Sequence, residues 1–210
     1  MVRGTGKVTA DAVYQMIPDW NLSDKVKGMC FDTTAFNTSR KNGACVLIEQ
    51  RMERDLLWFP CRHHVLEIML EAVVSPALLG SSGPDIPLFK RFKTKWNTID
   101  QTSYDQLDKY SQAESDEIVK FAVRKLEEDQ PRDDYKELLE LTIILLGGVL
   151  PGGVKFRKPG AYHRARWMTT FIYSIKIFMF KKQFILKAAE ARNLEEICRF
   201  CVSIYIKNWF

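Results

Sequence analysis

Two short apolar runs with strand character constrain the fold of this 210-residue chain more than any other feature. Residues 26–31 are β-compatible and lead directly into Asp32, and residues 56–59 form a second short run that Pro60 stops. Between the two runs, the segment that begins at Ala44 spaces its apolar and charged residues as a helix with two distinct faces. A helix that connects two strands predicts a parallel pair.

Helical patterns surround this pair and fill the rest of the chain. Residues 9–20 predict a first helix with Thr9 as its cap, and residues 61–74 predict a helix that runs to Pro76. A Pro-, Gly- and Ser-rich loop follows, and further helical patterns cover residues 88–96, 104–130, 132–148 and 168–186. We therefore expect a helix-rich α/β fold with an α/β part over residues 1–75 and a mostly α-helical region over residues 76–210. The second region contains a basic, Gly- and Pro-rich connector at residues 151–167.

The composition is too apolar for a disordered tail and too charged for a bundle of membrane-spanning helices. The chain is 46% hydrophobic and 27% charged, and lysines 176, 181 and 182 interrupt its longest apolar stretch. The first ten residues lack the apolar core of a secretory signal. We expect a nuclear or cytoplasmic protein with no membrane association, whose five cysteines are reduced thiols or metal ligands.

Charge is distributed unevenly along the chain. The formal net charge is +5, but residues 100–150 carry a net charge of −7 and residues 151–210 a net charge of +9. One interpretation is a basic surface that binds a polyanion such as nucleic acid. The other is that the acidic and basic segments pair with each other in the fold.

Asp32 is the acid whose position most favours chemistry. It follows a predicted buried strand and precedes a polar turn, where a carboxylate can point into a cleft and hold Mg²⁺ with other acids. The alternative is that Asp32 caps a turn or a short helix.

Cys61 and His64 form a C-x-x-H motif at a predicted junction between strand and helix. This pair supplies two of the four ligands of a closed zinc site, and Cys198 and Cys201 could supply the others. The alternative is that these cysteines are small buried apolar residues. We favour this alternative, and therefore do not expect zinc binding.

Arg164, Arg166 and Trp167 put basic groups and a large aromatic ring at the entrance to a predicted helix. Guanidinium groups bind phosphates and an indole can stack on an exposed base, so these residues are candidates for DNA binding. The alternative places Trp167 in the core.

Three segments in this order resemble the hAT superfamily of transposases: FDTTAFNTSRKNGACVLIEQ, LLWFPCRHHVLEIML and HRARWMTTF. In that family, a catalytic aspartate ends a strand before a turn that contains Asn, a C-x-x-H follows after a helix, and an Arg-Trp pair comes later in a helical insertion. Asp32, with Asn37 and Gly43, matches the first feature, Cys61 and His64 match the second, and Arg166 with Trp167 matches the third.

The resemblance implies a partial RNase H-like core, followed by a helical insertion domain. It also implies strand transfer on DNA, with two aspartates and a glutamate holding Mg²⁺. Here Asp32 would be the second acid, whereas Asp11 and Asp19 are poor candidates for the first and no closing glutamate is found. We therefore expect a transposase-derived fragment that is catalytically inactive and retains DNA binding.

Two other functions fit the residues. A helical interaction or scaffold protein would use its charged helices for protein partners. A small zinc-binding module would use Cys61, His63 or His64, Cys198 and Cys201. The apolar tail at residues 204–210 predicts either a truncated chain or a surface that a protein partner or a second copy covers.

Overall fold

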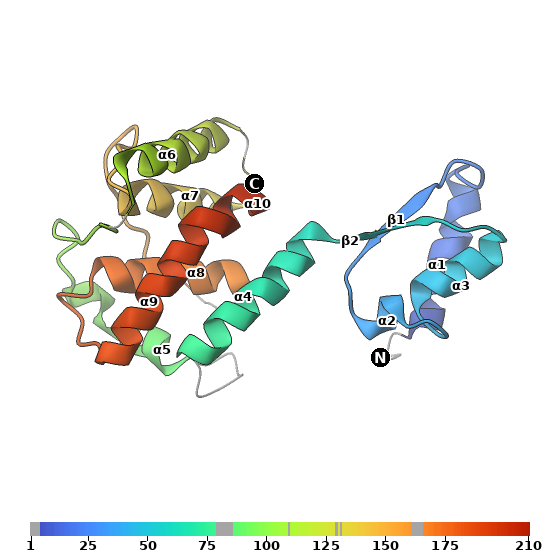
Figure 1. Cartoon of the computed structure of the whole chain (residues 1–210), viewed down its shortest axis with the longest axis horizontal. Coiled ribbons are helices and arrows are strands. Elements are labelled where there is room, and N and C mark those ends of the chain that lie inside the picture. Colours follow the sequence, from blue (N-terminus) through green and yellow to red (C-terminus); the bar gives the residue numbers. More distant parts are fainter. Residues whose placement is uncertain (1–4, 79–85, 109, 129, 131, 161–165) are drawn as a thin grey trace. The chain divides into compact units, whose positions relative to one another are not determined.

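A computed structural model of the chain describes residues 5–78, 86–108, 110–128, 130, 132–160 and 166–210. The chain forms two compact units, Met1–Ile68 and Met69–Phe210, each of which is described by itself (Figure 1). The division falls within helix α4 (Arg62–Leu78), near the predicted boundary at residue 75.

The first unit is built around two parallel strands. Strands β1 (Gly28–Phe31) and β2 (Leu57–Pro60) pair in register from Gly28 with Leu57 to Phe31 with Pro60. Helix α3 (Ala44–Met52) connects them, so the parallel pair that the two apolar runs predict is confirmed. The pair is the whole sheet that the described residues form.

Helix α1 (Gly6–Asp19) lies beside α3 in this unit (Figure 1). Ala10, Ile48 and Leu56 form a small core, against which Met29 of β1 packs. The predicted cap at Thr9 is wrong, because the helix begins one turn earlier, where the Thr5 hydroxyl accepts a hydrogen bond from the N–H of Val8 at 3.3 Å.

The second unit is helical in its described part. Its elements, in chain order after the end of α4, are α5 (Pro87–Lys95), a 3-10 turn (Trp96–Thr98), α6 (Gln112–Glu127), α7 (Asp133–Leu145), α8 (Arg166–Met179), α9 (Ala188–Phe200), a π-helical turn (Cys201–Tyr205) and α10 (Ile206–Trp209). Helix α8 packs against both α7 and α9 (Figure 1). None of the helices in the described part of the chain is long and apolar enough to cross a bilayer.

One predicted helix, residues 104–130, is shorter than its pattern indicates. The N–H of Asp105 donates to the Met179 carbonyl at 2.7 Å, and that of Leu107 donates to the Leu145 carbonyl at 2.9 Å. These bonds hold the segment in an extended form along other helices. Helix α6 begins only at Gln112, where Ser111 and Glu114 form a capping box.

The C-terminal tail is part of the core of the second unit. Tyr205, Ile206 and Trp209 are buried, and the ring of Trp209 stacks on Tyr205 with the centroids 5.2 Å apart. The expectation that this tail is an exposed apolar surface for a partner or a second copy is therefore wrong. The π-helical turn and α10 bury Cys201, Val202, Tyr205, Ile206 and Trp209, which lie on one face at helical spacing.

Candidate functional site

The carboxyl ends of β1 and β2 bring the predicted site residues to one edge of the first unit. Asp32 follows β1, and Cys61 follows β2. The Cys61 N–H donates to the carbonyl of Phe31 at 2.7 Å, and the Cys61 carbonyl accepts from Val65 N–H at 3.0 Å as α4 begins. Strand pairing and the start of the helix therefore fix Cys61 beside the loop that carries Asp32.

The carboxylate of Asp32 organises that loop. Its Oδ1 accepts the Thr34 N–H at 3.0 Å, the Thr34 hydroxyl, and the Asn37 Nδ2 at 2.9 Å. The two bonds from Thr34 hold the pKa of Asp32 below its ordinary value, and the Asn37 amide acts in the same direction. Asp32 thus performs the capping role that was the alternative to a catalytic one.

His64 lies in the first turn of α4, three residues after Cys61. Its charge is the smallest of the effects that lower the pKa of Asp32. Its Nδ1 is 3.8 Å from Oε2 of Glu67, one turn along the helix. The structure thus brings Asp32, Cys61 and His64 to one edge.

Gly43 permits the close approach of the loop to α3. A Cβ at this position would lie 2.6 Å from the carbonyl oxygens of Asn37 and Ser39. The Gly43 N–H donates to the same Ser39 carbonyl at 2.9 Å. Only glycine fits here, which accounts for its place in the motif with Asp32 and Asn37.

The residues at this edge do not fit a Mg²⁺ pair. One carboxylate oxygen of Asp32 is engaged by three donors, and the neighbouring ionisable side chain is an imidazole, whereas Mg²⁺ prefers oxygen ligands. Within the described residues, no group of three or more His, Cys, Asp and Glu side chains is placed to hold a metal ion.

Three of the remaining cysteines, Cys45, Cys198 and Cys201, have the environment of apolar core residues. Cys198 and Cys201 are buried in the second unit, and burial raises the pKa of both thiols. Burial also raises the pKa of Cys45, to about 11. Their burial is that of small apolar core residues. Cys30 is exposed, and none of the five forms a disulfide.

The acidic and basic segments pair with each other within the second unit. Among the described residues, five ion pairs join residues 100–150 to residues 151–210: Arg157 with Asp133 and Glu140, Lys176 with Glu137, Lys182 with Asp105, and Lys207 with Glu117. This is the second of the two interpretations of the uneven charge. It leaves fewer cations of the basic segment for a polyanion.

The predicted DNA-binding residues fall largely outside the described part of the chain. Arg164 lies in residues 161–165, which the structure does not describe. Arg166 and Trp167 begin helix α8, but their side chains are not among those described. Their role stays a prediction.

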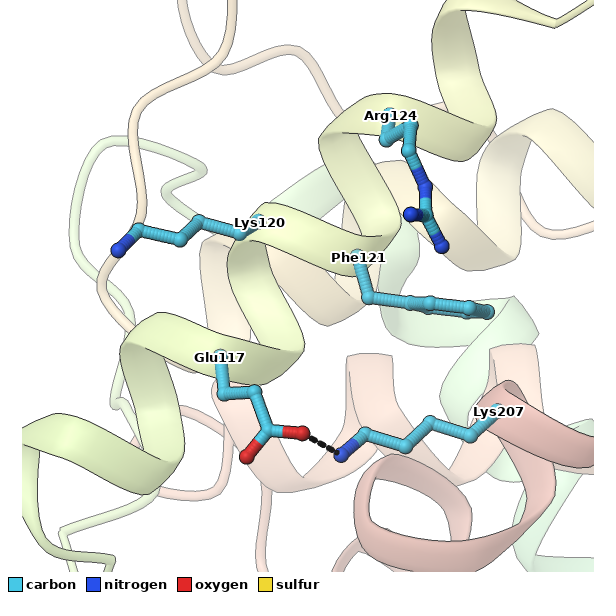
Figure 2. A pocket seen from close by; sticks show the side chains of 5 residues that line it. All are labelled: Glu117, Lys120, Phe121, Arg124 and Lys207. Atoms are coloured by element: carbon cyan, nitrogen blue, oxygen red, sulfur yellow. Dashed lines mark hydrogen bonds and ion pairs between the residues drawn. The ribbon is translucent and has the colours of Figure 1, made fainter.

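A basic hollow on the second unit was not predicted from the sequence. It is lined by Glu117, Lys120, Phe121 and Arg124 of α6 and by Lys207 of α10, and has a volume of about 400 Å³. Figure 2 shows the Phe121 ring between the side chains of Arg124 and Lys207, with Lys120 extending outward from the helix. The Arg124 guanidinium lies over the ring, 5.5 Å from its centroid.

Two of the three cations in this hollow have no ion-pair partner among the described residues. Lys207 pairs with Glu117 at 2.6 Å, whereas Lys120 and Arg124 are exposed and paired with no acid in this part of the chain. Lys120 and Arg124 are four residues apart, so the sequence indicates that they share one face of α6. No sequence pattern indicates that Lys207 lies beside them.

Comparison of the chain with protein-family models, with curated proteins and with solved structures finds no match.

Proposed function

We propose that this chain is a transposase-derived protein of hAT type that binds DNA and is catalytically inactive. It would consist of part of an RNase H-like core followed by a helical insertion-type region. The observation that carries this proposal is the arrangement at the carboxyl ends of β1 and β2. Asp32, Cys61 and His64, which the resemblance names from two separate motifs, meet at that edge.

The proposal that the chain is catalytically inactive rests on its aspartates. Asp32 is engaged by Thr34 and Asn37 and interacts with an imidazole. The segment that precedes β1 is helix α1, in which Asp11 is paired with Arg51 of α3. The segment in which the family's first aspartate is expected on a strand is thus helical here, and its Asp11 forms an ion pair.

The DNA-binding part rests on the basic hollow together with the predicted Arg166 and Trp167. Lys120 and Arg124 offer two exposed charges to phosphates, and the Phe121 ring holds the guanidinium in place. Each phosphate contact releases counterions from DNA, so binding would depend strongly on salt.

The test is DNA binding by fluorescence anisotropy on a labelled duplex and a labelled hairpin. Arg124→Ala and Arg166→Ala should each weaken binding and reduce the salt slope by about one phosphate contact. Lys41→Ala, an exposed charge on the first unit, is the control and should change neither. Equal losses in all three variants would contradict a defined DNA surface on the second unit.

A second candidate function is a helical protein-interaction module, and the five internal ion pairs favour it. If the basic segment serves the fold, its charges do not bind DNA, and the exposed surfaces are open to protein partners. Retention of DNA at low salt discriminates the two candidates, because the interaction module predicts none.

A further inference from the structure

Helix α5 presents a strongly basic outer face. Its sequence, PLFKRFKTK, contains no acid, and Leu88, Phe89 and Phe92 are buried against the rest of the second unit. Because these apolar residues take the inner side, the four cations of the helix are exposed: Lys90, Arg91, Lys93 and Lys95. Figure 1 shows α5 and α6 at opposite ends of the second unit, with α8 between them. This basic face is therefore separate from the hollow on α6.

Contacts with α8 and α9 hold this face in place. Phe89 stacks on Tyr173 of α8 with the ring centroids 4.8 Å apart. Arg91 pairs with Glu190 of α9 at 3.1 Å, and its guanidinium also donates to the Ile185 carbonyl at 2.7 Å. The helix that carries the cations is thus fixed on the unit before any ligand binds.

The described part of the basic connector, residues 151–160, lies beside α5. The Gly160 carbonyl accepts the Tyr173 hydroxyl at 2.6 Å and the Nζ of Lys93 at 3.4 Å. Lys158 is exposed two residues before Gly160, and two residues of chain span at most about 7 Å. Lys93 and Lys158 therefore belong to one surface, and neither pairs with an acid among the described residues.

The charge of this surface selects a polyanion as its ligand. Cations three or four residues apart on a helix have their Cβ atoms about 5–6 Å apart, which gives a dense row of positive charge. No large apolar side chain of α5 is exposed, so the face lacks the apolar anchor of a helix that binds a membrane surface. Lysines bind phosphates as point charges, and contacts to backbone phosphates carry no sequence information.

We propose that the outer face of α5 and the connector at Lys158 bind the phosphate backbone of duplex DNA without reading its sequence. This inference rests on the proposed DNA binding and gives it a second contact surface, distinct from the hollow on α6. The surface continues along the chain toward Arg166, the predicted DNA-binding residue that begins α8, six residues after Gly160.

The test is fluorescence anisotropy of a labelled duplex with the whole chain at about 100 mM salt, which compares Thr94→Glu with Thr94→Gln. Thr94 is exposed, one turn from Lys90, and both variants lose the bond from its hydroxyl to the Lys90 carbonyl at 3.1 Å. The two variants therefore differ in charge alone. Thr94→Glu should bind the duplex about fivefold or more weakly than Thr94→Gln, which should bind as wild type does.

The salt slope tests the lysines of the surface. Lys93→Gln and Lys158→Gln should each reduce the slope by about one phosphate contact. Lys27→Gln removes an exposed charge from the first unit and should leave the slope unchanged. Because the two surfaces are separate, the fold-changes of Thr94→Glu and Arg124→Ala should multiply in the double variant.

The outcomes separate this inference from the proposed function. Equal DNA binding by Thr94→Glu and Thr94→Gln, with binding by wild type intact, overturns the inference and leaves DNA binding at the hollow standing. No DNA binding by wild type overturns both. Should Thr94→Glu fail to fold, as judged by circular dichroism, the slopes of Lys93→Gln and Lys158→Gln decide. Displacement of the duplex by a polyglutamate peptide at equal charge concentration would overturn the inference in favour of an acidic protein partner.

Discussion

At the scale of single residues, the loop after β1 is organised by one carboxylate and one glycine. Asp32 accepts three hydrogen bonds through Oδ1, and Gly43 allows the loop backbone to approach α3. Both residues belong to the segment that resembles a catalytic motif. In this structure, their contacts stabilise the loop.

Removal of the Thr34 hydroxyl should raise the pKa of Asp32. In Thr34→Val the carboxylate loses its strongest donor, and its pKa should move toward the ordinary value of 3.8. Asn37→Ala and His64→Ala should give smaller shifts in the same direction. Carboxyl ¹³C NMR during a pH titration measures all three, and an unchanged pKa in Thr34→Val would contradict this account of the loop.

The same shift makes the first unit less stable in acid. The folded pKa of Asp32 is lower than the unfolded one, so the carboxylate contributes its full stabilisation above the ordinary value of 3.8. This contribution is lost as the pH falls through the lower folded pKa. In Thr34→Val the acid-dependent part of the stability should shrink, as urea denaturation at pH 5 and at low pH would show.

Gly43→Ala should destabilise the protein by about 1–3 kcal/mol, because the added Cβ would lie 2.6 Å from backbone oxygens that cannot move without opening the loop. Gly160→Ala is the control, since no atom lies within 4 Å of a Cβ there. Urea denaturation followed by circular dichroism compares the two. Equal stability of both variants would show that the loop accommodates a side chain.

At the scale of helices and strands, one buried ion pair joins helices α7 and α8 of the second unit. Lys176 of α8 is fully buried, where its Nζ contacts Glu137 of α7 and donates to the Arg157 carbonyl at 2.6 Å. The Nζ also lies over the Trp96 ring, 5.4 Å from its centroid. Burial lowers the pKa of Lys176, and the attraction of Glu137 opposes this.

Breaking this buried pair should cost far more than removing both partners. Lys176→Met leaves Glu137 without its cation and should destabilise by about 3–5 kcal/mol, whereas the double variant with Glu137→Leu should recover much of that loss. Lys182→Met removes a solvent-exposed partner of Asp105 and should change the stability much less than Lys176→Met does. A small change in the free energy of unfolding of Lys176→Met, measured by urea denaturation, would contradict this role of the Lys176–Glu137 pair in stability.

The C-terminal turn should be as essential as any core helix. Trp209→Ala removes a buried ring that contacts Tyr205 and the edge of Tyr135, and should cost about 3–5 kcal/mol. Ile204→Ala changes an exposed residue of the same turn and should stay within about 0.5 kcal/mol of wild type. A thermal melt in which both variants match wild type would mean that the tail is dispensable.

The sequence predicts an element well when the residues that end it lie next to it in the chain. Asp32 and Pro60 end the two strands, so their parallel pairing could be expected from the sequence. The segment at Asp105 could not, because its backbone bonds to the Met179 carbonyl, far along the chain. The pattern also does not predict the short helix α2 (Ala35–Thr38), a single turn whose Asn37 side chain donates to the Asp32 carboxylate.

In the candidate sites, too, the sequence predicts what depends on local contacts and does not predict what depends on distant ones. Asp32, Cys61 and His64 were each singled out from local motifs, but their meeting at one edge was not predicted from the sequence. The basic hollow was not predicted either, because α6 and Lys207 meet only in the folded unit. Likewise, the contact of the connector with α5 forms only in the folded unit, and periodicity does not predict it.

At the scale of the whole molecule, the charges divide between folding and binding. Five ion pairs use cations of the basic segment within the second unit, while Lys120 and Arg124 stay exposed in the hollow of Figure 2. The net charge of +5 is therefore divided between cations that stabilise the second unit and cations that are exposed to a ligand.

The most direct test of the central proposal is the salt dependence of DNA binding by the wild-type chain. Fluorescence anisotropy of a labelled duplex and a labelled hairpin would be followed from about 50 to 200 mM salt. We predict binding at the low end and a steep loss of affinity, with a slope of several ions. No binding to either DNA at about 50 mM salt would contradict the proposal that this chain retains DNA binding.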